Sequence, residues 1–532
     1  MAATANSRAE RRALTRFPRP SVAAAHPRSR SLATTGVAIA AALCSAPGHA
    51  ERFQLDTAIS SDVTATSNSL LAESAQSDVI VSVRPRFVLL AEGARLRLRG
   101  SGSLNAVSYT RNTQESRALP DLDLSAAAIA IERALTLEAG ARVSQQFENP
   151  FGLRAETAGT ANRVTTTQYR FSPVLDIQSN GGMRVFARSD NIRLDDDTST
   201  LNGAATSTAT GYFGHHNAVI EQQPRPLGAR VELDRTDTRY ENTQRPLISD
   251  IARAVVTYSF GDRLTLGLRG GGERNNFVVG DRTRAVYGVE MAWRPTERTD
   301  FSTAIDHRYF GTGGRLAFNH RMPWVAWNLL LTRDIVSTPQ TLLDLPPTDN
   351  VAALLDQLYT TRFPDPIERS RQVQEVIARG GLPASLTQAT TVYSQRISLQ
   401  TYGSLRVAYV GTRNSLALSG FWSRLEDAPE TGALATSLAL NNNIQQGVGL
   451  TGSRRMTPTI TLRLGLDRST IKSLGVATTD QASEQRSVRV DMTVQLAPRT
   501  SSYVGVRHTE FIQNQAVRND EDAAFVGIDH RF

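Results

Sequence analysis

Charged side chains recur at every second position of short apolar stretches, and they are the residues of this sequence best suited to chemistry. Arginine has a planar guanidinium group that binds carboxylates through two hydrogen bonds, so arginines facing water suit an anionic or sugar polymer. Inter-strand ion pairs filling a polar interior would give the same pattern, and the mixed signs favour this second interpretation. The residues that we assign to a lumen are Arg95, Arg97, Arg99, Arg230, Arg269, Arg463, Arg489, Glu290 and Asp491.

Other patterns that could indicate catalysis or metal binding are weak. The sequence has no HExxH, CxxC, P-loop or GxSxG motif. His215 and His216 are adjacent, and neighbours in a strand point to opposite faces, so they cannot chelate one metal. The acidic run 195–197 lacks EF-hand spacing and reads as a solvated loop. Glycines 270–272 precede no helix and suggest relief of strand curvature or crowding. We therefore expect no catalytic residue, no metal and no cofactor.

The elements that would hold the charged residues are strands. Apolar residues alternate with polar ones over about ten residues, as in 488–496, 460–467 and 287–294. Short turns alternate with long polar segments, which favours a membrane barrel over a soluble sandwich. The predicted fold is all-β: a transmembrane, up-and-down antiparallel β-barrel of about 18–22 strands, with 22 as the best count, from Arg52 to Phe532. The count requires 388–410 to be one strand.

Aromatic residues near strand ends suggest interfacial girdles at the level of lipid head groups. The positions assigned to them are Tyr109, Tyr169, Phe186, Tyr258, Phe260, Trp293, Tyr309, Phe310, Trp422, Tyr503 and Phe511.

Both ends of the chain agree with an envelope protein. Residues 1–50 resemble a secretory signal, with seven arginines against one acid, a short apolar run and a cleavage site near Ala50. That segment holds most of the net charge of +8, so no nucleic-acid partner is expected. The last strand ends on Phe532 and resembles the C-terminal signal that the barrel-assembly machinery reads. The predicted location is the cell outer membrane, in contact with its lipid.

One segment, residues 341–381, breaks the strand pattern. Val351, Leu354, Leu355 and Leu358 share one helical face. A second helix should begin at Asp365-Pro366-Ile367-Glu368, where Asp365 caps, Pro366 takes the first position and Glu368 completes a capping box. It should end at Gly380-Gly381. Strand parity places this insertion at a long-loop end, where it could cover the mouth, fold into the lumen as a plug, bind a partner or pack on the rim.

The same region carries a resemblance. Residues 358–369 (LYTTRFPDPIER), followed by Gly380-Gly381-Leu382-Pro383, resemble a family of outer-membrane β-barrels associated with the PEP-CTERM/exosortase system. Segments 391–395 and 411–414 are also similar. Members occur with exopolysaccharide biosynthesis genes, so the resemblance implies a role in exopolysaccharide export, with polysaccharide or export components as partners. The family offers no catalytic motif to transfer.

The sequence therefore suggests a non-enzymatic channel or scaffold, porin-like, in the outer membrane. Two alternatives remain: a general diffusion porin and a surface adhesin barrel. A further alternative, an outer-membrane lipid hydrolase, would need a serine and a histidine on one strand face near a girdle, and the sequence alone places no such pair.

Overall fold

The computed structural model describes most of the chain beyond the predicted signal. The described residues are 50–147, 149, 151–152, 163–197, 210–240, 245–279, 282–337, 350–360, 362–378, 382, 386–387, 389, 397–429, 442–474, 481–514 and 517–532. The predicted signal therefore lies outside the described residues except for Ala50, and so does the predicted helix end at Gly380-Gly381.

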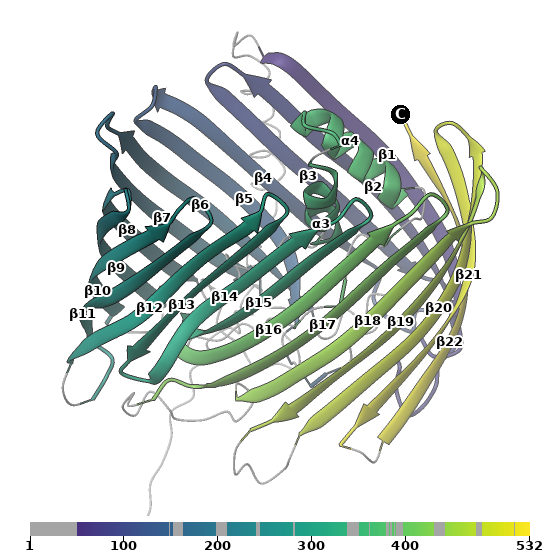
Figure 1. Cartoon of the computed structure of the whole chain (residues 1–532). Coiled ribbons are helices and arrows are strands. Elements are labelled where there is room, and N and C mark those ends of the chain that lie inside the picture. Colours follow the sequence, from purple (N-terminus) through teal and green to yellow (C-terminus); the bar gives the residue numbers. More distant parts are fainter. Residues whose placement is uncertain are drawn as a thin grey trace, which may run out of the picture. The chain divides into compact units, whose positions relative to one another are not determined.

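Twenty-two strands and two helices make up the described part of the chain (Figure 1). The strands are β1 (Ala50–Thr66), β2 (Asp78–Gly93), β3 (Leu96–Tyr109), β4 (Arg117–Ile131), β5 (Leu135–Phe147), β6 (Arg163–Gln178), β7 (Met183–Asp197), β8 (Gly211–Gln222), β9 (Leu227–Tyr240), β10 (Leu247–Phe260), β11 (Leu264–Asn275), β12 (Thr283–Thr296), β13 (Thr299–Arg308), β14 (Gly311–Arg321), β15 (Val325–Ser337), β16 (Ile397–Val410), β17 (Asn414–Asp427), β18 (Asn443–Arg455), β19 (Ile460–Ser473), β20 (Ala482–Ala497), β21 (Thr500–Gln513) and β22 (Val517–Arg531). The helices are α3 (Asn350–Tyr359) and α4 (Pro366–Ala378).

The sheet closes on itself. Each strand pairs antiparallel with the next along the chain, and β1 pairs with β22 from Ala58 opposite Arg531 to Thr66 opposite Ala523. The barrel, its closure by the last strand and the count of 22 strands are as predicted. Tyr402-Gly403 lies inside β16, as the count required, and this strand begins at Ile397. The backbone N–H of Phe532 donates to the carbonyl of Thr57, 3.0 Å away, which fastens the chain end to the first strand.

The two faces of the sheet differ as the alternation predicted. On β22, Val526 and Ile528 are 52% and 46% exposed, whereas Phe525, which faces the interior, is 6% exposed. Val488, Val490 and Met492 likewise lie exposed on the outer face of β20, and Asp491 is buried on the inner face. A closed barrel satisfies every strand N–H and C=O internally, so its apolar outer face can meet hydrocarbon. The described chain thus has the architecture of an outer-membrane protein.

Some predicted girdle residues face the wrong way. Tyr109, Phe310 and Phe511 are buried, and the hydroxyl of Tyr503 donates to Asp62 inside the barrel at 3.3 Å. Position near a strand end does not fix the face, because parity along the strand decides it. Tyr169, Tyr258, Phe260, Trp293 and Trp422 are exposed as expected.

The predicted helical insertion is present. The shared face of α3 is buried, with Leu355 fully enclosed, and α4 begins at Pro366 as its start signals indicated. Neither described helix is both long and apolar enough to cross a bilayer.

Crowding explains one of the clustered glycines. A β-carbon at Gly271 would lie 1.9 Å from the carbonyl oxygen of Ala252 on β10. A β-carbon at the neighbouring Gly270, on the opposite face, would meet nothing within 4 Å. The predicted relief of crowding therefore holds at Gly271.

We expect Gly271→Ala to destabilise the barrel, because the methyl group forces β10 and β11 apart at a cost of about 1–3 kcal/mol. Gly270→Ala is the matched control and should melt like the parent. The measurement is the temperature at which the compact barrel converts to the unfolded form in denaturing gel electrophoresis. Equal melting of the two variants would contradict the crowding.

Candidate functional site: a luminal cavity beside a helical hairpin

The helices α3 and α4 form a hairpin that packs against the inner wall of the barrel. Val351, Leu354, Leu355 and Leu358 of α3 and Val373 of α4 form one buried cluster with Ala326, Ala408 and Ala417. These alanines lie side by side on β15, β16 and β17. They face inward, because Trp327, Tyr409 and Leu416 beside them are exposed on the outer face. Of the placements that the sequence left open, the structure shows the hairpin folded into the lumen.

The hairpin reaches the end of the barrel opposite to its own attachment. It leaves the sheet after Ser337 and returns before Ile397, at the long-loop end. The three alanines, however, lie next to the short turns at 322–324 and 411–413. A cavity of about 520 Å³ is lined by Trp324 together with Leu358, Tyr359 and Arg362 of the hairpin tip. Figure 1 shows α3 and α4 near the same end as the C-terminus. The hairpin tip therefore lies at the short-turn mouth.

Polar contacts hold the hairpin to other strands. Asp365 pairs with Arg52 of β1 at 2.9 Å, and both side chains are substantially exposed, so this pair is weak. Thr387, beyond α4, donates a hydrogen bond to Asp467 of β19. Within the hairpin, Arg369 of α4 pairs with Asp356 of α3 at 2.7 Å. The hairpin thus contacts three separate parts of the wall.

Glu368 is the third residue of α4, the position predicted to complete the capping box. Its carboxylate accepts hydrogen bonds from Arg371 and Gln372, one turn further along α4. The bond from Arg371 holds the pKa of the Glu368 carboxyl below its ordinary value. The start of α4 agrees with the sequence signals, while Asp365 also serves the contact with β1.

One part of the luminal wall is electrically balanced. The β9–β13 ion network consists of Arg230, Glu232, Arg253, Arg269, Glu290 and Asp306. Arg230 lies 2.7 Å from both Glu232 and Glu290, and Arg269 lies 3.2 Å from Glu232. Every side chain in the network is less than a fifth exposed. The predicted Arg230, Arg269 and Glu290 therefore come together as ion pairs that fill the wall.

A second predicted cluster also forms. Arg463 and Arg489 both bind Asp491, at 3.0 Å each, and Asp491 is 1% exposed beneath them. The guanidinium of Arg489 also lies over the ring of Phe525, 4.3 Å from its centroid. One buried carboxylate therefore binds two arginines of the luminal wall.

The other side of the lumen is hollow and basic. A cavity of about 1010 Å³ is bounded by β1–β6, by β19–β22 and by Ala352, Gln374, Ile377 and Leu382 of the insertion. Its charged lining residues are Arg84, Arg86, Arg99, Arg142, Arg163, Arg463, Arg489, Arg507, Asp62, Asp121, Asp123 and Asp529. Glu521 lies buried behind Arg507, as Asp491 does behind Arg463 and Arg489. An excess of arginine remains.

Three arginines of this cavity form no ion pair within the described part of the chain. Among the described residues, no carboxylate forms an ion pair with Arg84, Arg99 or Arg142, in contrast with the β9–β13 ion network. Arg99 and Arg142 both lie beside β4, opposite Ser125 and Asp123 respectively. The site can therefore bind an anion by charge and by bidentate hydrogen bonds.

The other two predicted luminal residues, Arg97 and Arg95, have different outcomes. Arg97 has the inward parity of Arg99 on β3 and is exposed, but it does not line the cavity. The assignment of Arg95 is wrong: it lies in the turn between β2 and β3, is 69% exposed and pairs with Glu132 at 3.0 Å. The turn occupies residues 94–95, so β3 begins at Leu96, after the position at which the alternation had placed a strand.

A second cavity continues the first along the wall. It has a volume of about 720 Å³ and runs to Phe532 and the short turns. The two cavities share Arg86, Asp529 and Gln374 in their linings. Arg86 and Asp529 are joined at 2.7 Å, and Gln374 projects from α4. The two cavities therefore adjoin beside α4, and the second extends toward the short turns.

The weaker sequence patterns also have definite places. The acidic run 195–197 belongs to the end of β7, so its description as a loop was wrong, and Asp195 pairs with Arg193 at 3.1 Å. No group of three metal-binding side chains forms among the described residues. His215 contacts Asp234 at 3.2 Å, while His216 contacts Ser189 at 2.8 Å.

The contact between Ser189 and His216 was missed by the sequence reasoning. Both lie on the outer face, because Ser189 is opposite His216 between β7 and β8 and neighbouring Ile220 is 54% exposed. These strands are joined by a long segment, so the sequence gives no turn from which to count their register.

No family model matches the chain, and no curated protein matches its sequence. Solved structures that resemble it include the ferric enterobactin receptor PfeA of Pseudomonas aeruginosa, with a TM-score of 0.44 and 10% identity over 90% of this chain and 80% of that one. The FrpB iron transporter of Neisseria meningitidis gives 0.45 and 10% over 90% and 82%. The siderophore receptor PirA of Acinetobacter baumannii gives 0.46 and 9% over 90% and 80%. The strand pairing establishes the barrel, and nothing about the ligand of this chain follows from these likenesses.

We expect Leu355→Asp to release the hairpin, because a buried unpaired charge costs several kcal/mol and the hairpin is an insertion outside the sheet. Gln357→Asp places the same charge on a partly exposed position of α3 and is the matched control. The single-channel conductance of Leu355→Asp in planar bilayers should exceed that of the parent several-fold. Equal conductance of all three folded proteins would show that the hairpin does not obstruct the lumen.

Proposed function

We propose that this barrel is a gated outer-membrane conduit for an anionic exopolysaccharide, with the hairpin of α3 and α4 as its gate. The observation that carries the proposal is the set Arg84, Arg99 and Arg142, which form no ion pair within the described part of the chain and lie in a cavity beside that hairpin. A structural wall would neutralise these groups, as the β9–β13 ion network does across the lumen. Guanidinium groups that form no ion pair can bind the carboxylates of a ligand through two hydrogen bonds.

The lining chemistry suits a hydrated polymer. Ser101, Ser103, Asn105, Ser125 and Gln145 lie among the arginines of the cavity. Hydroxyl and amide groups exchange hydrogen bonds with sugar hydroxyls, while arginines bind uronate carboxylates. The resemblance of 358–369 to the PEP-CTERM/exosortase-associated barrels supports export as the direction and exopolysaccharide as the polymer class.

The hairpin distinguishes this proposal from a general diffusion porin. An open porin needs a clear lumen, whereas here the apolar face of α3 is sealed against Ala326, Ala408 and Ala417 at the short-turn mouth. Its contacts with β1 include the exposed ion pair between Asp365 and Arg52, and an exposed pair of this kind contributes little to stability. Such a device suits a polymer that must be admitted selectively.

The proposal predicts that Arg99→Gln with Arg142→Gln weakens the binding of oligogalacturonate by about tenfold or more, because each arginine contributes a charge-assisted hydrogen bond. The measurement is calorimetric titration of the purified barrel, with neutral dextran oligomers of the same size as the comparison ligand. Added salt should weaken oligogalacturonate binding as well.

Arg333→Gln is the matched control, because Arg333 follows the exposed Leu331 on the outer face of β15. It should bind oligogalacturonate like the parent. Equal affinity for dextran and oligogalacturonate, or no loss in the double variant, would contradict an anion-selective conduit.

A further inference from the structure

The outer wall carries a trough of about 690 Å³ across β5–β12. Ala187, Ala218, Ala252 and Gly272 occupy neighbouring strands in one row, together with Leu175 and Leu233. Small side chains in a row leave a hollow, and the 52% exposure of Leu233 places that hollow on the lipid face. An apolar trough on this face fits an acyl chain.

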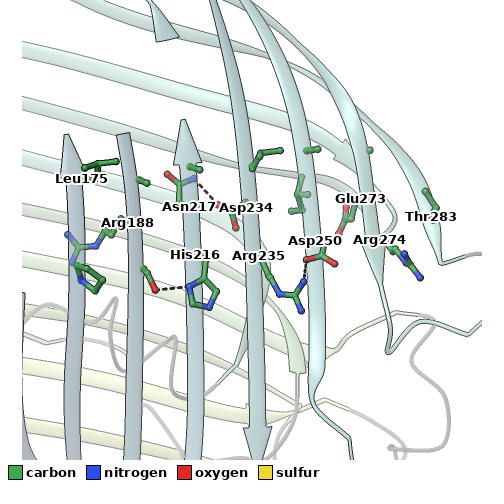
Figure 2. A pocket seen from close by; sticks show the side chains of 18 of the residues that line it. Leu175, Arg188, His216, Asn217, Asp234, Arg235, Asp250, Glu273, Arg274 and Thr283 are labelled. Carbon is green, nitrogen blue, oxygen red and sulfur yellow. Dashed lines mark hydrogen bonds and ion pairs between the residues drawn. The ribbon is translucent and has the colours of Figure 1, made fainter. Parts of the chain in front are cut away.

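A polar row borders the trough. It lies two residues along each strand toward the long loops. Its members are opposite one another on β7 to β11 and are Ser189, His216, Arg235, Asp250 and Arg274; Figure 2 shows the last four. Arg235 and Asp250 lie 3.3 Å apart and are about half exposed, so their attraction is weak. Arg274 is exposed and, among the described residues, pairs with no carboxylate.

The row lies where the apolar band ends. On β9, the outward Leu227, Val231 and Leu233 are exposed, and the next outward residue is Arg235. On β11, Leu266 and Leu268 precede Arg274 in the same way. Charged side chains at that level meet lipid head groups, and the long-loop end assigns them to the outer leaflet.

The contact of Ser189 with His216 raises the question of ester cleavage. Ser189 Oγ lies 2.8 Å from Nδ1 of His216, and Asn191 donates to the same oxygen at 3.0 Å. The other ring nitrogen lies toward Gly214, where a β-carbon would be 3.0 Å away. Among the described residues no carboxylate is hydrogen-bonded to that nitrogen, so no group orients the imidazole as a catalytic base. The row is suited to binding rather than to hydrolysis.

We propose that this trough and polar row bind a diphosphorylated glycolipid of the outer leaflet, one acyl chain lying over the alanines. Arg235 on β9 and Arg274 on β11 are two strands apart, about 10 Å at the usual strand spacing. Two cationic centres so separated match phosphates at opposite ends of a disaccharide better than the single phosphate of a glycerophospholipid. The site is independent of the lumen.

The test is native mass spectrometry of the purified barrel with diphosphoryl lipid A, monophosphoryl lipid A or phosphatidylglycerol added. The parent should retain one diphosphoryl lipid A about tenfold or more tightly than the other two lipids. Arg235→Gln with Arg274→Gln should lose that preference, since each arginine supplies a charge-assisted bond. Arg333→Gln, an outward arginine on β15, is the charge control and should keep it.

A second variant tests the trough without touching charge. Ala218→Leu fills the hollow and should weaken retention of diphosphoryl lipid A, whereas Ala524→Leu on the exposed face of β22 should not. Equal retention of the mono- and diphosphoryl lipids would overturn the two-phosphate assignment. Retention unchanged in both the arginine and the Ala218 variants would overturn the site.

Discussion

The whole molecule depends on the requirement that no backbone N–H or C=O may face hydrocarbon without a partner. The pairing of β1 with β22 meets it, because an open sheet would expose two strand edges to lipid. Closure then fixes which side chains meet water. Parity along each strand sends Val526 and Ile528 outward and Phe525 and Asp529 inward, so every luminal feature follows from this one constraint.

Inside the barrel, electrostatics divides the wall into two kinds of surface. In the β9–β13 ion network, arginines and carboxylates are held within a few ångströms of one another, and the low exposure of Arg269 and Asp306 leaves no room for a ligand. Across the lumen, Arg84, Arg99 and Arg142 line a cavity of about 1010 Å³ and form no ion pair with any described carboxylate. The hairpin is anchored by apolar contacts on β15–β17, and its residues Gln374 and Ile377 border the basic cavity.

Much of this was accessible from the sequence, since a period of two and a final aromatic strand predict a closed barrel directly. The start of α4 followed from local signals and the buried face of α3 from the spacing of its apolar residues, and Arg99, Arg463 and Asp491 were placed inward by parity alone. Contacts between strands joined by long segments were not accessible, because register depends on turns that the sequence does not define there. That is why Ser189 and His216 were not paired. Arg95 was placed in a strand because it has the parity of Arg97 and Arg99, although it lies in the short turn before β3. The luminal position of the hairpin required packing on Ala326, Ala408 and Ala417, which no local pattern encodes.

The most direct test of the account asks whether the hairpin must leave the wall for the conduit to open. Arg52→Cys with Asp365→Cys replaces the exposed pair between β1 and the start of α4, and the chain beyond the predicted signal has no other cysteine. Single-channel conductance is recorded after joining the two thiols with a short cleavable bis-maleimide, and again after cleavage. The account predicts that openings are absent while the hairpin is tethered and return when the tether is cut. The same openings before and after cleavage would contradict it.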